Sequence, residues 1–341
     1  MWTLPKLAAC SVAKSPYLKH SLRTFATTQR SKVKMGQLIN GKWTETNEVQ
    51  PNPTVHAYEL GTSEFPFDEH TPAGRYHLYV AKSCPFAQRA EIALNVKKLS
   101  SKIGLSHVNP VQTPQGWGFE PHDIPGVGDQ VHHLKYLHEV YSKFDPNYTG
   151  RASVPLLVDT ETNRIVSKES ADIVAIFSKI SNEGPDLRLH PEAQEKAAPF
   201  FGQFFGGVLK VGKSQYQKSY DEAIASLYET IESIDAFLAD KKFLAGDELT
   251  AVDIDTFPAF AYFEIGLALK MSITGNRLRD YPNLDAYIRR VYQVPDVGRS
   301  VNAAHWKMSM FAEINKGNFI SEKKEHIVPA TPTLDWNKPI N

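Results

Sequence analysis

The sequence predicts a mixed α/β domain followed by an all-α domain, and three observations support this fold class. Apolar segments in the order β-α-β and then β-β-α occupy residues 76–185. After Gly184-Pro185 the apolar spacing is helical only, to about residue 317. A chain of 341 residues with 42% hydrophobic residues can form about two cores of ordinary size.

Composition excludes several classes of protein. Lys plus Arg and Asp plus Glu both number 38, so the charge gives no indication of a nucleic-acid partner. Cys10 and Cys84 are the two cysteines of the sequence and cannot form a disulfide framework. There is no run of about 18 apolar residues, so we expect no membrane span. The histidines show no metal-ligand spacing, and we expect no metal site.

Residues 1–35 have the composition of a mitochondrial transit peptide. The first acidic residue is Glu45, whereas Lys and Arg alternate with Ser and Thr before it. Arg23-Thr24-Phe25-Ala26 resembles a processing site, with the cut after Phe25. We therefore expect a mitochondrial protein; the alternative is a disordered basic tail on a cytoplasmic one. Residues 36–75 contain many Pro and Gly and are expected to form an extended arm.

The first strand and helix of the α/β domain enclose a cysteine. Tyr76–Val80 is apolar and β-prone, and a helical pattern follows over residues 86–98. Cys84 stands between them, directly before Pro85, and proline is favoured at the first helical position. The free N–H groups and the helix dipole favour a thiolate at such a position and lower its pKa. The alternative is a buried structural thiol. No second cysteine follows at CxxC spacing, so an external thiol must resolve any intermediate.

The middle of this domain is predicted to bring a proline opposite the thiol. Leu105–Asn109 predicts a second strand, and the loop over residues 110–130 is rich in Gly and Pro. Val131–Phe144 has helical spacing. Ser153–Asp159 predicts a buried strand with Pro155 near its start. After a βα unit that carries a thiol, this proline is expected to be cis and to face the thiol; an ordinary trans proline at a strand edge is the alternative.

The last β-β-α part places two polar residues at a helix start. Ile165–Val166 predicts a short strand, and a helix opens within residues 167–173. Glu169 and Ser170 lie in its first turn, where they can cap the helix. They can also bind the ammonium and the carboxylate of an amino acid, although capping is the commoner role of such residues. The whole order of elements over residues 76–185 is that of the thioredoxin fold.

Residues 190–317 are predicted to form the all-helical domain. The expected helices are Pro191–Gly206, Ser219–Ala239, Ala251–Leu269, Pro282–Tyr292 and Pro295–Met310. Thr250 and Asp253 have the spacing of an N-terminal capping box. Residues 318–341 are rich in Pro and Lys and predict an irregular tail.

Several stretches resemble a known family of enzymes. They are GRYHLYVAKSCPFAQR (74–89), DPNYTGRASVPLLVD (145–159), KES (168–170), SQYQKSYDEA (214–223), FLAGDELTAVDI (243–254) and DYPNLDAYIRRVYQVPDV (280–297). They are similar to the xi, or omega-like, class of glutathione transferases, whose members are S-glutathionyl-hydroquinone reductases. The likeness covers roughly residues 40–330. The long insert over residues 110–150 favours the xi class over the omega class.

The resemblance implies a glutathione transferase architecture with glutathione as co-substrate, no metal, and a homodimer. It makes Cys84 the catalytic residue. The residues implied to bind glutathione are Phe86, Trp117, Arg151, Val154, Pro155, Glu169 and Ser170. Trp117 would pack on the tripeptide, and Arg151 and Val154 would hold it beside Pro155. Glu169 and Ser170 would bind its γ-glutamyl end, which favours binding over capping for this pair.

Two positions depart from the family pattern. Leu209 and Leu267 stand where tyrosines that contact a hydroquinone oxygen are expected. A leucine can neither donate a hydrogen bond nor transfer a proton. The acceptor pocket is therefore expected to differ from that of the family, while the glutathione-binding part is retained.

The expected function is that of a glutathione-dependent thiol transferase or reductase. Its cysteine would remove glutathione from an adduct through a mixed disulfide, which a second glutathione then resolves. Glutathionyl-hydroquinones, mixed disulfides and dehydroascorbate are the expected substrates. The alternative is a non-catalytic protein of the same fold that binds glutathione or a hydrophobic ligand, with Leu209 and Leu267 lining an apolar pocket.

Overall fold

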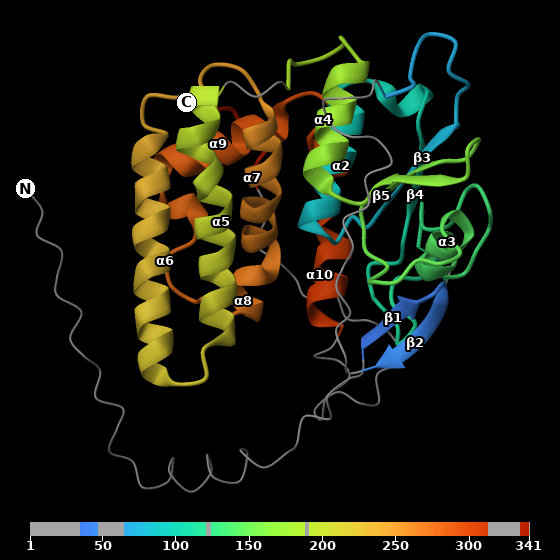
Figure 1. Cartoon of the computed structure of the whole chain (residues 1–341). Coiled ribbons are helices and arrows are strands. Elements are labelled where there is room, and N and C mark those ends of the chain that lie inside the picture. Colours follow the sequence, from blue (N-terminus) through green and yellow to red (C-terminus); the bar gives the residue numbers. More distant parts are fainter. Residues whose placement is uncertain (1–34, 47–64, 121–123, 188–190, 313–334, 341) are drawn as a thin grey trace, which may run out of the picture. The chain divides into compact units, whose positions relative to one another are not determined.

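The computed structural model describes residues 35–46, 65–120, 124–187, 191–312 and 335–340 (Figure 1). The expected transit peptide and its cleavage site lie outside the described residues. Within the described ranges, no helix is both long and apolar enough to cross a membrane.

The described chain begins with a β-hairpin. Strands β1 (Met35–Ile39) and β2 (Lys42–Thr46) pair antiparallel through the turn Asn40-Gly41. Both turn residues have positive φ, at 49° and 71°, which is the conformation that favours Asn-Gly in two-residue hairpins. The hairpin attaches to the α/β domain because the Leu38 N–H donates to the Gly150 carbonyl over 2.9 Å. An arm that is extended throughout residues 36–75 was therefore the wrong expectation, and the Asn-Gly pair was the signal for this turn.

The α/β domain is built on a four-stranded sheet of order β4-β3-β5-β6. Its strands are β3 (Tyr76–Val80), β4 (Gly104–His107), β5 (Leu156–Asp159) and β6 (Arg164–Ser167). Strand β3 is parallel to β4 and antiparallel to β5, and all five of its residues are buried. This topology confirms the predicted thioredoxin-like fold.

Three helices cover this sheet. Helices α2 (Pro85–Val96) and α4 (Ser170–Ile180) pack together on one face. Helix α3 (Leu137–Phe144) lies on the other side, against β6 (Figure 1). A 3₁₀ turn, Leu99–Ser101, follows α2.

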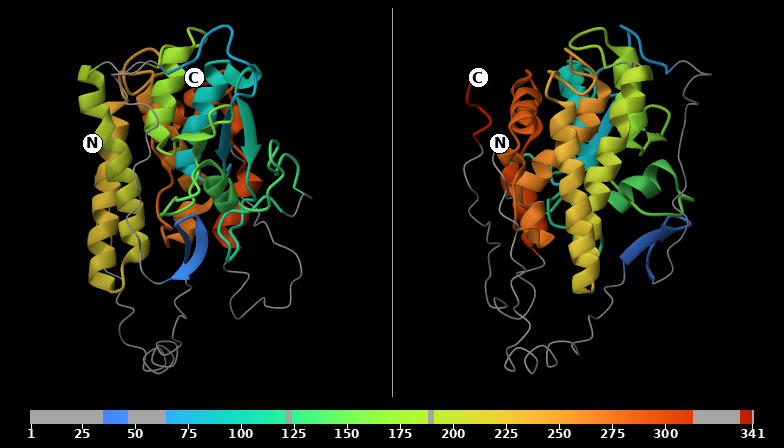
Figure 2. Two further views of the ribbon diagram at one scale, coloured as in Figure 1. Left: turned by 45° about the vertical axis from the view of Figure 1, so that its right-hand side comes forward. Right: turned by 90° about the vertical axis from the view of Figure 1, so that its left-hand side faces the viewer.

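The second domain is all-helical, as predicted. Its elements are α5 (Pro191–Lys213), α6 (Gln217–Phe237), α7 (Ala251–Tyr262), a π-helical turn (Phe263–Leu267), α8 (Ala268–Lys270), a 3₁₀ turn (Leu278–Asp280), α9 (Pro282–Gln293), a 3₁₀ turn (Gly298–Ser300) and α10 (Ala303–Phe311). Helices α5 and α6 lie side by side in all views (Figure 2). Helix α7 packs on both α5 and α2, so it joins the two domains.

The capping box at the start of α7 is confirmed. The Thr250 N–H donates to Asp253 Oδ2 over 2.8 Å, and the Thr250 hydroxyl donates to the same oxygen. The other carboxylate oxygen accepts from the Tyr287 hydroxyl of α9 at 3.1 Å. Asp253 therefore fixes the start of α7 and ties it to α9.

Three predicted helices are shorter than expected, and two of them begin late because a polar side chain accepts hydrogen bonds from the backbone N–H groups. The helix expected over residues 131–144 begins at Leu137, because Asp129 accepts hydrogen bonds from the N–H groups of Val131, His132 and Leu134. The helix expected from Pro295 begins at Ala303, where Asn302 accepts from the His305 N–H at 3.0 Å. The helix expected to continue to Leu269 changes to a π-turn after Tyr262.

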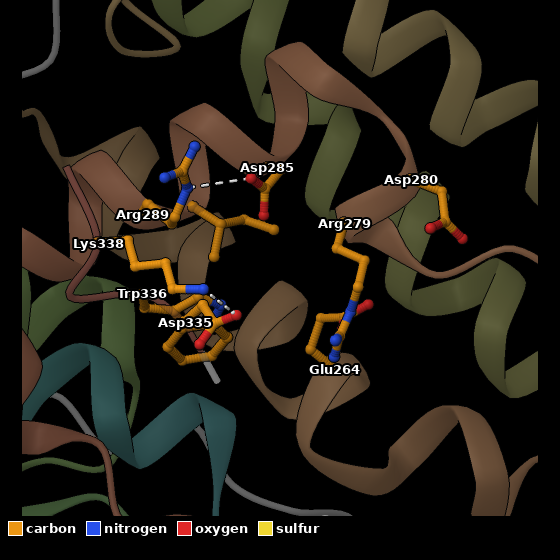
Figure 3. Close-up of a pocket in the computed structure, with 9 residues that line it drawn as sticks. Glu264, Arg279, Asp280, Asp285, Arg289, Asp335, Trp336 and Lys338 are labelled. Carbon is orange, nitrogen blue, oxygen red and sulfur yellow. Dashed lines mark hydrogen bonds and ion pairs between the residues drawn. The ribbon is translucent and has the colours of Figure 1, made fainter. Parts of the chain in front are cut away.

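The C-terminal segment Asp335–Ile340 packs on α9 without forming a helix or strand. The Gln293 amide donates to the carbonyls of Trp336 and Lys338, over 2.6 and 2.8 Å, and Trp336 is 6% exposed. A charged cavity of about 340 Å³ lies beside this segment (Figure 3). Six of its charged side chains form three pairs: Asp335 with Lys338 at 2.8 Å, Asp285 with Arg289 at 3.0 Å, and Glu264 with Arg279 at 3.2 Å. We interpret this cavity as part of the junction that holds the segment in place.

Candidate active site

Cys84 lies where the prediction placed it, between a buried strand and a helix. After β3 the chain turns, and the Cys84 N–H donates to the Ala81 carbonyl over 3.0 Å. Cys84 has extended φ and ψ angles and is the N-cap of α2, with Pro85 as the first helical residue. The indole N–H of Trp306, on α10, donates to the Lys82 carbonyl. Both domains therefore fix the loop that carries the thiol.

The electrostatics of Cys84 differ from the expectation. Burial raises the pKa of the thiol, while the backbone N–H groups of Ala87 and Phe86 and the charge of Arg89 lower it. Burial is the largest of these effects, so the pKa lies above its ordinary value. The prediction of a lowered pKa was wrong, because it counted the helix terminus and not the desolvation of the thiol.

The peptide bond between Val154 and Pro155 is cis, as predicted. Val154 is 7% exposed, and β5 begins directly after Pro155. Two phenols hold the segment before it: Tyr141 donates to the Ser153 carbonyl over 2.8 Å, and Tyr148 donates to the Arg151 carbonyl over 3.2 Å. The side chain of Arg151 is exposed.

Glu169 and Ser170 begin α4, and the contacts of Glu169 bear on one of the two roles considered for it, helix capping. Glu169 is the N-cap residue, but its side chain makes no capping hydrogen bond. The Ser167 hydroxyl instead accepts from the Glu169 N–H at 3.0 Å. The Glu169 carboxylate is half-exposed, with Lys168 Nζ at 3.9 Å from one oxygen. Plain helix capping therefore does not explain the glutamate.

The two aromatic residues expected to bind glutathione, Trp117 and Phe86, lie on different elements. Trp117 is half-buried on the loop after β4, and its carbonyl accepts from the N–H of Leu137 at 2.9 Å. The Ser83 hydroxyl donates to the Pro110 carbonyl over 3.3 Å, which ties this loop to the one that carries the thiol. Phe86 is 39% exposed, and its ring meets that of Phe201 of α5 edge-on at 5.7 Å.

Arg89 is a residue that the sequence analysis missed. Its Nε donates to the Asp255 carbonyl of α7 over 3.1 Å, and a longer contact of 3.5 Å reaches the Ser170 hydroxyl. Its guanidinium carbon lies 3.9 Å from the centre of the Phe201 ring and 5.0 Å from that of Phe86. One side chain of α2 thus connects α4, α5 and α7 beside Cys84. Its place in CPFAQR, one turn after the cysteine, was the available signal.

The two leucines of the expected acceptor pocket lie in different environments. Leu209 is half-buried on α5 and lines an open cavity of about 600 Å³ with Lys210, Lys213 and Tyr216. Leu267 is 3% exposed, belongs to the hydrophobic core, and does not line that cavity. The structure therefore does not bring both leucines to one surface. In the part of the chain that the structure describes, no group of three or more acidic, Cys or His side chains is arranged for a metal ion.

A thioredoxin-like domain followed by an all-helical domain is the architecture of the glutathione transferases. The family model of the glutathione S-transferase N-terminal domain matches residues 83–180. The model of the C-terminal domain matches residues 190–295.

The comparisons with individual proteins narrow the class. Glutathionyl-hydroquinone reductase YqjG of Escherichia coli is 30% identical over 81% of this chain and 90% of its own length. Glutathionyl-hydroquinone reductase PcpF of Sphingobium chlorophenolicum is 31% identical over 76% of this chain and 83% of its own. The xi-class enzyme of Natrialba magadii superposes with a TM-score of 0.77 at 30% identity, over 90% of this chain and 96% of the other. The chain belongs to the xi-class glutathione transferases, the family of the glutathionyl-hydroquinone reductases.

Proposed function

We propose that this protein is a glutathione-dependent reductase that removes glutathione from glutathionyl adducts through Cys84. The observation that carries the proposal is the position of Cys84, at the start of α2 in a chain with a cis-proline before β5. Glutathionyl-hydroquinones are the first substrate class to test, because the relatives YqjG and PcpF carry that activity in their names. Mixed disulfides of glutathione and dehydroascorbate follow.

The reaction consists of two successive attacks of a thiolate on sulfur. The Cys84 thiolate attacks the glutathione sulfur of the adduct, a new S–S bond forms, and the leaving group departs with the electron pair of the broken bond. A second glutathione, as its thiolate, attacks the sulfur of the bound glutathionyl group. Glutathione disulfide leaves and the Cys84 thiolate is restored.

The proposed glutathione contacts follow from the chemistry of each group. Glu169 can pair with the γ-glutamyl ammonium because its carboxylate makes no capping bond. Ser170 and the N–H groups at the start of α4 can bind the γ-glutamyl carboxylate. Val154 precedes β5, where an extended peptide can add to the sheet edge through its backbone. Phe86, Trp117, Arg151 and Pro155 complete the proposed site.

The proposal is tested with Cys84→Ser on a panel of glutathionyl-hydroquinone, a mixed disulfide and dehydroascorbate. Serine is a far weaker nucleophile, so we expect a loss of more than about 1,000-fold in turnover of every substrate that the wild type accepts. Cys10→Ser is the control and should retain full turnover. Turnover that survives in Cys84→Ser would refute a role for this thiol.

A second candidate function is that of a binding protein without catalysis. The raised pKa of Cys84 and the apolar side chain of Leu209 favour it. Such a protein would bind glutathione or a hydrophobic dye with equal affinity in the wild type and in Cys84→Ser, and would turn over no member of the panel.

We further propose mitochondrial import and a homodimer. The acid-free, basic composition of residues 1–44 supports import. N-terminal sequencing of the mature chain tests it, and a start at Met1 would refute processing. Light scattering coupled to size exclusion tests the dimer, and the mass of a single chain would contradict it.

A further inference from the structure

A tyrosine outside the two positions that carry leucine packs on the indole that holds the thiol loop. Tyr262 is the last residue of α7 and is half-buried. Its ring meets that of Trp306 edge-on, with centres 5.0 Å apart and planes at 84°. Trp306 in turn donates its indole N–H to the Lys82 carbonyl, two residues before Cys84. The phenol is thus connected through one indole ring to the loop that carries the thiol.

The backbone explains why the phenol is found at residue 262 rather than at 267. A π-helical turn begins directly after Tyr262, and such a turn changes the direction of later side chains relative to those before it. Leu267 ends this turn and is buried in the core, at 3% exposure. The last side chain of the regular helix therefore packs beside the thiol loop. Helix α10, which packs against the π-turn, contributes both Trp306 and Ser309 to the surroundings of Tyr262.

We propose that Tyr262 is the proton donor of the acceptor half of this site: its hydroxyl gives its proton to the leaving group when Cys84 takes up the glutathionyl sulfur. This inference rests on the proposed function. It assigns to Tyr262 a role that Leu209 and Leu267 cannot perform, because a hydrocarbon side chain carries no transferable proton.

The proposed steps balance in atoms and electrons. The bond between the glutathione sulfur and the leaving atom breaks; that atom is a ring carbon in a glutathionyl-hydroquinone and a sulfur in a mixed disulfide. The electron pair of the broken bond goes to that atom, and the proton of Tyr262 follows to it. The resulting tyrosinate takes a proton from the thiol of a second glutathione. That glutathione, now a thiolate, attacks the mixed disulfide on Cys84. The products are the protonated acceptor, glutathione disulfide and the original enzyme.

The charge on Cys84 controls how acidic the Tyr262 hydroxyl is at each stage of the reaction. Burial raises the pKa of Tyr262, a negative charge on Cys84 raises it further, and the Ser309 hydroxyl lowers it. Tyr262 therefore holds its proton while Cys84 is a thiolate. Once Cys84 is part of a neutral disulfide, that repulsion is absent, so the phenol becomes more acidic at the moment when the leaving group needs a proton.

Tyr262→Phe tests the proposal, because it removes the hydroxyl and retains the ring that packs on Trp306. Two substrates are compared: glutathionyl-hydroquinone, whose leaving group is a poor one, and a mixed disulfide of glutathione with a nitrated aromatic thiol, which leaves as a stable thiolate. We expect kcat/KM to fall by about 100-fold for the first and by less than about threefold for the second. Tyr292→Phe, on α9 against Trp336, is the matched control and should leave both values unchanged.

Each outcome decides the proposal. An equal loss with both substrates would show that Tyr262 acts only in packing, and unchanged values would refute any role; both overturn the inference while leaving the proposed function intact. A wild type that turns over neither substrate would refute the proposed function itself. Should Tyr262→Phe not fold, Ser309→Ala retains the phenol but removes the neighbouring hydroxyl that makes it more acidic. A loss confined to glutathionyl-hydroquinone would support the proposal in that variant, and no change would overturn it.

Discussion

Replacing Arg89 with methionine tests how the two domains are held together beside the thiol. The guanidinium is 8% exposed and lies 3.6 Å from a carboxylate oxygen of Asp255, which is 35% exposed. Breaking a buried ion pair from one side costs about 3–5 kcal/mol, and solvent at Asp255 reduces this to about 2 kcal/mol. The lost cation–π contacts with Phe86 and Phe201 add about 1 kcal/mol. We therefore expect Arg89→Met to lower the free energy of unfolding by about 3 kcal/mol.

The assay is urea unfolding of four proteins at neutral pH: wild type, Arg89→Met, Asp255→Asn and the double variant. The sum of the stability losses in the two single variants should exceed the loss in the double variant by about 1–2 kcal/mol, because each single variant already breaks the same ion pair. Arg164→Met, at an exposed position of β6, is the control and should change stability by less than about 0.5 kcal/mol. A loss below about 1 kcal/mol in Arg89→Met, or additive losses, would refute the reasoning.

The stability loss caused by Arg89→Met should depend on pH. Burial raises the pKa of Asp255, and Arg89 lowers it. Without Arg89 the folded-state pKa rises further above the unfolded value. A raised folded pKa favours folding with Asp255 protonated, and this advantage is lost as the pH rises through the folded pKa. The stability deficit of Arg89→Met should therefore be larger at about pH 7 than at about pH 4.

Three further predictions follow from the charges in and near the site. Because burial raises the pKa of Cys84, its alkylation by iodoacetamide, followed by peptide mass, should accelerate about tenfold per pH unit between about pH 7 and 9. Glu169→Gln should raise KM for glutathione about tenfold with little change in kcat, because a charged hydrogen bond to the γ-glutamyl ammonium is lost. Burial lowers the pKa of His77 and of His305 from 6.5 to about 4, so each favours folding in its neutral form. That stability is present above the unfolded pKa and is lost as the pH falls, by up to about 3 kcal/mol for each histidine, which Tm measured from pH 7 to 4 would record.

Each of these three predictions would be refuted by a specific result. A rate of alkylation that is already constant below pH 7 would mean that Cys84 is acidic despite its burial. An unchanged KM in Glu169→Gln would remove this residue from the glutathione site. A constant Tm over the acid range would mean that His77 and His305 are charged in the folded protein.

Local signals in the sequence predicted the fold well. The apolar run Tyr76–Val80 coincides with β3, because a central strand is buried on both faces. Thr250 and Asp253 predicted the start of α7, since a capping box depends only on residues three apart. The cis bond before Pro155 followed from its position after a βα unit.

What the sequence did not reveal depends on contacts between distant segments. The pKa of Cys84 is raised mainly by burial, which depends on how distant segments pack around it. Arg89 connects helices that lie far apart in the sequence. Tyr262 comes near the thiol loop through Trp306. None of these contacts follows from hydrophobic spacing, which predicts helices and strands but not how they pack against one another.

The central claim is that Cys84 carries the glutathionyl group between the two half-reactions. Its most direct test is the mass of the full-length protein after incubation with glutathione disulfide, followed by digestion to locate the modified residue. The account predicts one glutathionyl group per chain on the peptide that contains Cys84, which fresh glutathione then removes. A chain that stays unmodified, or one modified only at Cys10, would contradict it.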